Sequence, residues 1–256
     1  MYKTSNNLFE IKNNIIFITG VSGQIGSNLA RLFLENDCKV YGVDLKKNKL
    51  KHKNFKFFKL DITNEKKVKD IFNKIVKNEK KIDVILNNAA VSFFSEILKK
   101  NDKETDFTYK VNLKGVINIT NEYLRIHKQK KLMECKIINI SSIYGLISPE
   151  FKIYEKGDRF SSEIYGATKA GLIQLTKYYS VLLAKYNILV NCISPGGIVN
   201  KKVQTKKFQK RYSNRVPLKR MAHVEDLFTT ILFLSSKKTK YVTGQNIVID
   251  GGLSSK

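Results

Sequence analysis

The stretch TGVSGQIG, residues 19–26, decides the fold expected of this 256-residue chain. It follows directly on the apolar run IIFI at 15–18, which is typical of a buried strand, and it leads into a predicted amphipathic helix at 25–34. The spacing GxxGxxG provides a tight turn, a close approach of backbone to a pyrophosphate, and a small residue where the helix packs on the strand; the glycines are Gly20, Gly23 and Gly26. The stretch predicts a dinucleotide-binding turn, with an ordinary glycine-rich strand–helix turn as the alternative.

Short apolar runs alternate with longer amphipathic segments along the rest of the chain. Further strands are predicted at 39–43, 55–60, 82–86, 136–140, 189–193 and 246–249, and further helices at 65–76, 105–127, 165–186 and 224–235. Strands separated by helices pair in parallel, and near-continuous apolar strands suit a sheet covered on both faces. We expect an α/β fold with a doubly wound, Rossmann-like, mostly parallel sheet. Three prolines and no linker-like segment predict one domain over residues 1–256.

An acidic residue, Asp44, follows the second predicted strand and comes 18 residues after Gly26. A carboxylate at this place accepts hydrogen bonds from the adenosine ribose of NAD and repels the 2′-phosphate of NADP. Lys46 and Lys47 follow at once and would tolerate that phosphate. The expected cofactor is therefore NAD, with NADP as the alternative.

A tyrosine and a lysine, Tyr165 and Lys169, stand four residues apart in YGATK at the start of a predicted helix. This spacing places both side chains on one face, where an ammonium favours the phenolate and lowers the pKa of the tyrosine. Ser141 and Ser142 follow the strand predicted at 136–140, and ligands bind beyond the carboxyl ends of such strands. The pattern predicts a proton donor and acceptor beside a hydroxyl, while a surface pair and a strand cap are the plain structural alternatives.

Taken together, these motifs resemble the short-chain dehydrogenase/reductase family over essentially the whole chain. The order of the motifs is that of the family: TGVSGQIG at 19–26, NNAA at 87–90, Asn112 in KVNLKG, SSIYG at 141–145, YGATK at 165–169, NCISPGG at 191–197 and VTGQNIVIDGG at 242–252. The glycine spacing is that of the family's longer, two-domain branch, whereas the short length and the part after Tyr165 follow the single-domain branch. More distantly, the chain is similar to oxidoreductases of bacterial surface-glycan and flagellin-modification pathways.

The resemblance implies an NAD(P)-dependent oxidoreductase that interconverts a secondary alcohol and a ketone. Tyr165 would be the catalytic acid or base, Lys169 would lower its pKa and hold the nicotinamide ribose, Ser142 would orient the carbonyl, and Asn112 would complete a proton relay through water. Besides Tyr165, Lys169, Asp44 and the three glycines, the implied cofactor contacts are Ser22, Gln24, Ile25, Asp61, Ile62, Asn88, Ala89, Ala90, Pro195, Gly196 and Ile198.

The charge of +25, from 47 basic and 22 acidic residues, is the outstanding compositional feature. Most basic residues are lysines, which spread over solvated surfaces, so a nucleic-acid-binding or regulatory module on this fold is kept only as an alternative. No Asp or Glu occurs between Glu163 and Glu225. The resemblance implies that this stretch folds over the substrate, and because positive charge beside a cleft holds anions, we expect an anionic substrate. The substrate contacts that we predict are Tyr144, Tyr154, Arg159, Lys206, Lys210 and Arg211.

The expected substrate is a sugar, a sugar phosphate or a nucleotide sugar of bacterial glycan biosynthesis. A sugar-nucleotide epimerase or dehydratase with tightly bound NAD is the second enzymatic alternative, suggested by the glycine spacing. The resemblance also implies a homodimer or homotetramer that pairs through the helices at 105–127 and 165–186.

Metal and membrane functions are not expected. The cysteines Cys38, Cys135 and Cys192 lack metal-ligand spacing, and the three histidines are scattered. No stretch has the roughly 20 apolar residues of a membrane span, and the N-terminal residues are polar. We expect a cytoplasmic protein that binds neither nucleic acid nor membrane.

Overall fold

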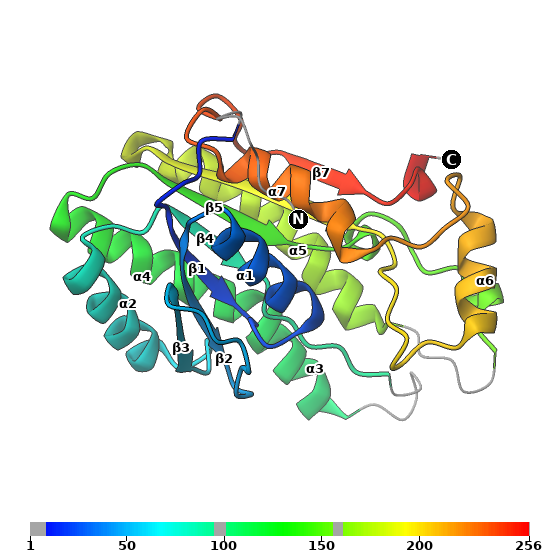
Figure 1. Ribbon diagram of the computed structural model, residues 1–256. Helices are drawn as coiled ribbons and strands as arrows, with labels where there is room; N and C mark the ends of the chain where they lie inside the picture. Colours follow the sequence, from blue (N-terminus) through cyan, green and yellow to red (C-terminus); the bar gives the residue numbers. More distant parts are fainter. Residues whose placement is uncertain (1–8, 95–100, 156–160, 256) are drawn as a thin grey trace.

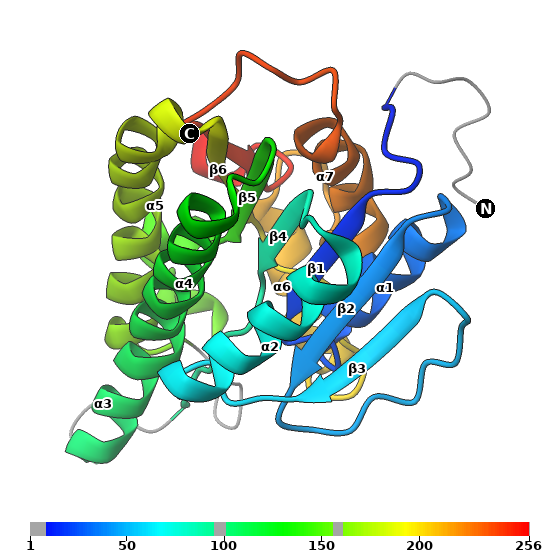
Figure 2. The same ribbon diagram turned by 90° about the vertical axis from the view of Figure 1, so that its left-hand side faces the viewer.

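The computed structural model describes residues 9–94, 101–155 and 161–255. Its centre is one parallel sheet of seven strands in the order β3-β2-β1-β4-β5-β6-β7, most of which Figure 2 shows from one side. The strands are β1 Ile15–Thr19, β2 Lys39–Asp44, β3 Phe55–Lys59, β4 Val84–Asn87, β5 Cys135–Ile140, β6 Ile188–Pro195 and β7 Asn246–Ile249. The order reverses between β1 and β4, which is the switch point where ligands bind in such sheets. The predicted α/β fold is confirmed.

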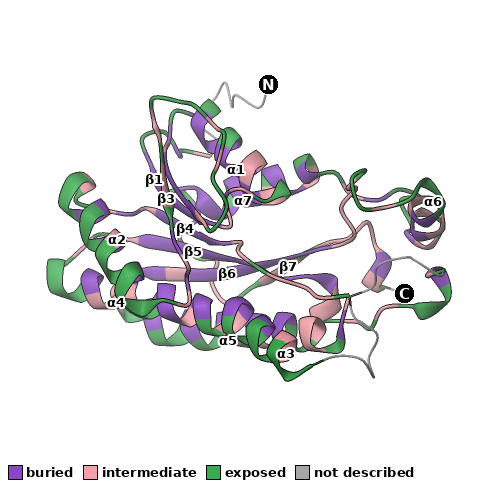
Figure 3. Cartoon of the chain, turned by 90° about the horizontal axis from the view of Figure 1, so that it is seen from below, coloured by how far each residue is buried: buried purple, intermediate pink, exposed green. Residues whose placement is uncertain are grey.

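Helices cover both faces of the sheet (Figures 1 and 3). One face carries α1 Gln24–Glu35 and α7 Phe228–Ser235, and the other carries α2 Glu65–Glu79, α4 Gly115–Lys130 and α5 Glu163–Leu183. Two shorter helices lie at one end of the sheet, α3 Asp102–Tyr109 and α6 Lys206–Arg215. Within the described residues, no helix is both long and apolar enough to cross a membrane.

All five side chains of β1 are buried, so this strand contributes to the core on both faces of the sheet. Neighbouring residues of a strand point to opposite faces. Ile16 and Ile18 pack with α1 and α7, while Ile15 and Phe17 pack with the helices of the other face. Successive apolar residues therefore serve two cores, which is why the strand is apolar without a break.

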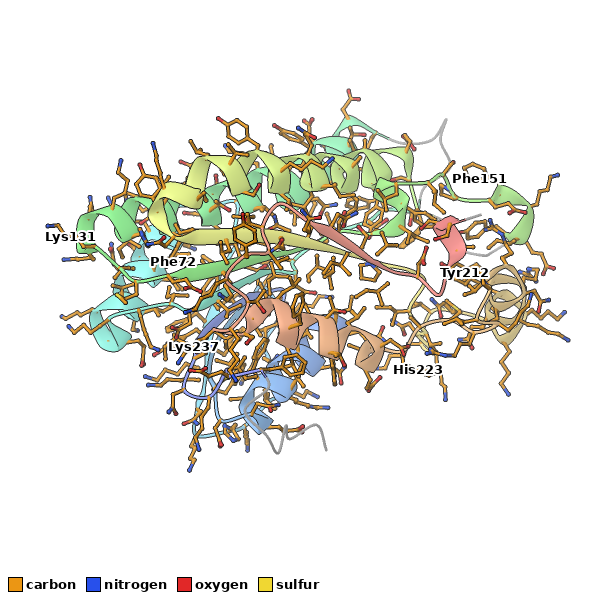
Figure 4. The ribbon with its side chains drawn as sticks, turned by 90° about the horizontal axis from the view of Figure 1, so that it is seen from above. Phe72, Lys131, Phe151, Tyr212, His223 and Lys237 are labelled. Carbon is orange, nitrogen blue, oxygen red and sulfur yellow. The ribbon has the colours of Figure 1, made fainter. Side chains whose placement is uncertain are left out.

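A third apolar cluster lies away from both faces, beneath α6. Its buried members are Ile143, Ile153, Phe208, Tyr212, Val216, Met221 and Leu253. Figure 4 shows Tyr212 and Phe151 at the same end of the molecule and Lys131 at the opposite end. This end lies beyond the carboxyl ends of the strands, where the sequence predicts the functional site.

Two helical segments differ from the sequence prediction. The helix predicted at 105–127 is interrupted by a π-helical turn, η2 Lys110–Lys114, whose defining bond runs from the N–H of Gly115 to the carbonyl of Lys110. The helix α6 is an addition, and its N-terminus is capped by Thr205, whose side chain accepts a hydrogen bond from the N–H of Phe208 at 3.1 Å.

Candidate active site

The glycine turn after β1 has the backbone geometry that a phosphate cradle requires. Gly20 has a φ of +67°, a conformation that glycine adopts without strain. A Cβ on Gly26 would lie 2.3 Å from the carbonyl oxygen of Gly20, so only glycine lets α1 pack this close to the turn. The side-chain amide of Asn88 donates to the carbonyls of Thr19 and Gly20, each at 3.0 Å. The turn is therefore held open at the N-terminus of α1, and it fits a pyrophosphate.

The carboxylate of Asp44 lies beside this turn at the end of β2. One oxygen accepts from the N–H of Ser22 at 3.0 Å and the other accepts from the N–H of Lys46 at 2.9 Å. These two bonds fix a negative charge next to the glycine turn. The position suits recognition of ribose hydroxyls and opposes a phosphate there.

Asp61 and Ile62 follow the neighbouring strand, β3. Asp61 accepts hydrogen bonds from both the N–H and the hydroxyl of Thr63, at 2.9 and 2.8 Å. Ile62 is buried, its side chain lies close to Gly115, and its carbonyl accepts from Asn118 at 3.1 Å. The side chain of Ile62 thus packs against α4, which leaves its backbone N–H as the group that could face a ligand.

The end of β5 is joined to the first turns of α5 by two buried hydrogen bonds. The hydroxyl of Ser141 donates to the carbonyl of Lys169 at 2.8 Å, and the ammonium of Lys169 donates to the carbonyl of Ile140 at 2.7 Å. Ser162 caps α5 by accepting from the N–H of Tyr165 at 3.3 Å. These contacts place Ser142, Tyr165 and Lys169 together at the carboxyl edge of the sheet.

Burial is the main cause of the pKa shifts of Tyr165 and Lys169. Burial lowers the pKa of Lys169 from 10.5 to about 8. Burial raises the pKa of Tyr165, while a hydrogen bond with Ser142 acts in the opposite direction. The Nζ atom of Lys169 lies 5.6 Å from the centroid of the Tyr165 ring, so the ammonium faces the ring.

Asn112 lies in the π-helical turn and is buried. Its side chain accepts from the N–H of Val91 at 2.8 Å and donates to the carbonyl of Val91 at 3.0 Å and to the hydroxyl of Thr168 at 3.1 Å. Thr168 precedes Lys169 in α5. Asn112 therefore connects the loop after β4 to the helix that carries Tyr165, and π turns of this kind are frequent at functional sites.

A pocket of about 180 Å³ opens between Tyr144 and α6. The hydroxyls of Tyr144 and Tyr154 are 2.8 Å apart, and the Tyr154 ring lies against Phe208 with centroids 5.4 Å apart. The N–H of Gly197 donates to the hydroxyl of Tyr212 at 2.7 Å. The pocket is lined by Phe94, Tyr144, Tyr154, Ser161, Gly197, Val203, Gln204, Phe208, Tyr212 and Met221.

Comparisons with known proteins agree with this geometry. A family model described as enoyl-(acyl carrier protein) reductase matches residues 20–254. The 3-oxoacyl-[acyl-carrier-protein] reductase FabG of Thermotoga maritima is 31% identical over 254 residues, which are 95% of this chain and 98% of that protein. The chain belongs to the short-chain dehydrogenase/reductase family. It is accordingly an NAD(P)-dependent oxidoreductase, as the sequence predicted.

Two further relatives show the breadth of the short-chain dehydrogenase/reductase family around this chain. The post-translational flagellin modification protein A of Campylobacter coli is 28% identical over 260 residues, covering 94% of this chain and 98% of that protein. A short-chain dehydrogenase from Leptospira borgpetersenii, solved with bound NAD+, is 36% identical with a TM-score of 0.91, covering 99% of this chain and 98% of that one.

The predicted substrate contacts on α6 lie away from this pocket. Phe208 and Tyr212 are the side chains of this helix that face the pocket, and Lys206 and Lys210 are exposed on its other side. Arg211 is turned toward the segment before α5. Lys206, Lys210 and Arg211 therefore do not line this pocket, because a helix with one buried face sends its lysines to the opposite face; their anion-binding role stays a prediction.

Two arginines of α6 pair with carboxylates of the segment that precedes α5. Arg211 donates to the carbonyl of Ile153 at 2.6 Å and pairs with Glu155 at 2.7 Å, and Arg215 pairs with Glu150 at 2.5 Å. The charge of both guanidinium groups is therefore balanced within the protein. Arg159, the remaining predicted basic contact, lies outside the described residues.

The remaining predicted cofactor contacts lie around the same edge. Pro195 ends β6, and a Cβ on Gly196 would lie 2.9 Å from the Cα of Asp250, so the backbone is closely packed there. Ile198 forms an isolated bridge with Ala222. Ser22 is part of the glycine turn, and Ile25 is the second residue of α1. Ala89 lies against Gly20, and Ala90 follows it in the sequence. No cluster of three or more potential metal ligands occurs in the described parts of the chain.

Sequence analysis missed several contacts that build the site. The buried amides of Asn87 and Asn139 are joined at 2.8 Å, and Asn139 donates to the hydroxyl of Thr176 at 2.9 Å. Phe208 and Tyr212 are spaced four apart within KKFQKRYSNR, a pattern that predicts a helix with one apolar face. The pocket wall on α6 could have been found from that spacing.

Proposed function

We propose that the protein interconverts a secondary alcohol and a ketone, with Tyr165 transferring the proton. The observation that carries this proposal is the meeting of Ser142, Tyr165 and Lys169 at the same sheet edge as the glycine turn. A hydroxyl, a phenol and an ammonium at the switch point match the groups that a carbonyl reduction requires. When bound, NAD(P) supplies or accepts the hydride.

The protonation state of Tyr165 suits proton donation to a substrate oxygen. Burial raises the pKa of Tyr165, so the phenol is protonated at neutral pH and is ready to donate to a developing alkoxide. We propose that Ser142 donates a hydrogen bond to the same oxygen. Lys169, whose ammonium faces the ring, stabilises the phenolate that remains. Asn112, through the π turn, is proposed to hold the water that returns the proton.

Asp44 supports NAD as the preferred cofactor. Its carboxylate is held beside the glycine turn by the N–H groups of Ser22 and Lys46, so the negative charge would oppose a 2′-phosphate. The Leptospira relative contains NAD+, and another solved relative, a 4-hydroxyisoleucine dehydrogenase that is 27% identical, contains NADH. ElxO, 28% identical, contains NADP, so NADP is the alternative.

The substrate that we propose is a sugar or a sugar derivative. The pocket presents aromatic rings and the hydroxyl pair of Tyr144 and Tyr154, which suit the apolar faces and the hydroxyls of a sugar ring. The flagellin modification relative supports a place in bacterial glycan biosynthesis. A 3-oxoacyl thioester is the second candidate, because the relative at 31% identity acts on such a group by name.

We also propose that the protein forms a homodimer or homotetramer through α5. Three large apolar side chains are exposed near the C-terminal end of this helix: Tyr178 by 60%, Val181 by 82% and Leu182 by 39%. Such a face is costly in water, and a second copy of the same helix would cover it.

Steady-state kinetics with a panel of ketoses, aldoses, sugar phosphates, nucleotide sugars and 3-oxoacyl thioesters tests the activity. Turnover with NADH is expected for one class, and Tyr165→Phe is expected to abolish it while NADH binding is retained. Tyr178→Phe, an exposed tyrosine on the same helix, is the control. Full activity of Tyr165→Phe would refute the assignment.

The two other functional alternatives give different results in the same preparation. An epimerase or dehydratase would convert a nucleotide sugar without net formation or consumption of NADH. A nucleic-acid-binding module would be retained on DNA in a steeply salt-dependent manner and would not bind NADH.

A further inference from the structure

A single side chain joins the phosphate-binding turn to the loop that leads to α6. The side-chain amide of Gln24, the first residue of α1, donates to the carbonyl of Val199 at 2.7 Å. Val199 follows the Pro195-Gly196 corner of β6. The two partners are 175 positions apart in the sequence, so this hydrogen bond links the glycine turn to the loop after β6.

The loop on the Val199 side is held in place by its own hydrogen bonds. The N–H of Val199 donates to the carbonyl of Ala222 at 2.8 Å. The amide of Gln204 donates to the carbonyl of Ile198 at 3.0 Å and accepts from the N–H of Asn200 at 2.8 Å. These hydrogen bonds fix the backbone around the carbonyl of Val199. The side chain of Gln24 reaches this carbonyl from the start of α1.

The glycine turn before Gln24 is held by hydrogen bonds as well. The N–H of Gly23 donates to the carbonyl of Gly20 at 3.1 Å, and the N–H of Ser22 donates to Asp44 at 3.0 Å. Gln24 follows the second glycine of the GxxGxxG spacing and is the first residue of α1, so its long side chain starts from the end of the turn. The bond from Gln24 to Val199 therefore restrains the distance between the glycine turn and the loop after β6.

We propose that Gln24 is a clasp that slows the exchange of the bound dinucleotide. A pyrophosphate bound at the N-terminus of α1 would lie next to Gln24, so the bond to Val199 would restrain the loop beside the bound dinucleotide. The clasp rests on the dinucleotide site of the proposed function, and it predicts that the cofactor leaves only after the bond has opened. Gln24 acts here as a positioning residue, because it restrains the loop and takes no part in the chemistry.

The size of the effect follows from the nature of the bond. A neutral, solvent-exposed hydrogen bond changes an equilibrium or rate constant by roughly 2- to 10-fold. Gln24→Met keeps the length of the side chain and removes the donor. We therefore expect NADH to leave this variant about 2- to 10-fold faster than it leaves the wild-type protein.

Stopped-flow fluorescence measures this release when the NADH complex is mixed with an excess of ADP-ribose. Gln174→Met, at an exposed glutamine of α5, is the matched control and should release NADH at the wild-type rate. An unchanged release rate in Gln24→Met overturns the clasp. Absence of NADH binding by the wild-type protein would instead refute the proposed function, so the two failures are distinct.

Hydrogen–deuterium exchange of the protein without cofactor gives a second readout. If Gln24 restrains the loop, the amides of residues 197–204 exchange faster in Gln24→Met, because the loop opens more often. Faster NADH release without this change would assign Gln24 to direct contact with the phosphate and would overturn the clasp.

Discussion

Replacing Lys169 by methionine is expected to stabilise the folded protein at pH 7 and to abolish turnover. The lysine is 3% exposed, and burial lowers its pKa from 10.5 to about 8. A shift of this size corresponds to roughly 3 kcal/mol of destabilisation by the charged form, at about 1.4 kcal/mol per pKa unit. Methionine removes that cost but leaves the carbonyl of Ile140 without its donor, which costs about 1–2 kcal/mol. The expected net gain is about 1–2 kcal/mol.

The gain depends on pH in a direction that can be checked. Between the folded pKa of about 8 and the unfolded value of 10.5, the unfolded chain binds more protons at Lys169 than the folded chain does. The wild-type protein therefore becomes more stable as the pH rises through this window, and the methionine variant does not. The advantage of the variant is present in full at pH 7 and is lost towards pH 10.5.

Urea denaturation followed by circular dichroism measures the free energy of unfolding at both ends of the accessible range, near pH 7 and near pH 9.5. Lys177→Met, at an exposed lysine of the same helix, is the control and should show neither the gain nor its pH dependence. A Lys169→Met variant that is less stable than wild type at pH 7, by an amount that does not change with pH, would refute the reasoning.

Three further predictions concern the turn, the π turn and the surface. Gly26→Ala should lose NADH binding and about 1–3 kcal/mol of stability, whereas Gly23→Ala, whose nearest contact is 3.3 Å, should retain its stability; fluorescence titration and thermal unfolding decide. Asn112→Ala removes three hydrogen bonds and should cost about 2–4 kcal/mol and lower kcat, so wild-type stability would contradict its linking role. Val181→Arg should reduce the mass seen by light scattering without changing the circular dichroism spectrum, and an unchanged mass would argue against pairing through α5.

Much of the fold and part of the site could be predicted from the sequence because their signals are local. The run at 15–18 predicts a strand buried on both faces, and the glycines that follow predict the turn, since each requirement acts on neighbouring residues. Tyr165 and Lys169 are one helical turn apart, so their shared face follows from helix geometry. The carboxyl-edge position of Ser142 follows from the strand before it.

The contacts of the basic side chains of α6 could not be predicted from such local signals. The sequence presents a run of basic residues without acidic neighbours, and their partners, Glu150 and Glu155, precede the run by a whole helix and strand. Composition alone does not show that two of these basic residues, Arg211 and Arg215, form ion pairs. The π turn could not be predicted for a similar reason, because Asn112 within it contacts Val91 and Thr168, which are distant in the sequence.

The third apolar cluster has a consequence for how such an enzyme can change. Its buried members are largely separate from the two cores that hold the sheet, and Tyr144, Tyr154, Phe208 and Tyr212 belong to it or pack against it. Residues of this cluster that line the pocket can thus be exchanged with little repacking of the two cores. Selection for a new substrate has a compact set of positions to act on, and libraries restricted to this cluster should yield altered specificity at little cost to folding.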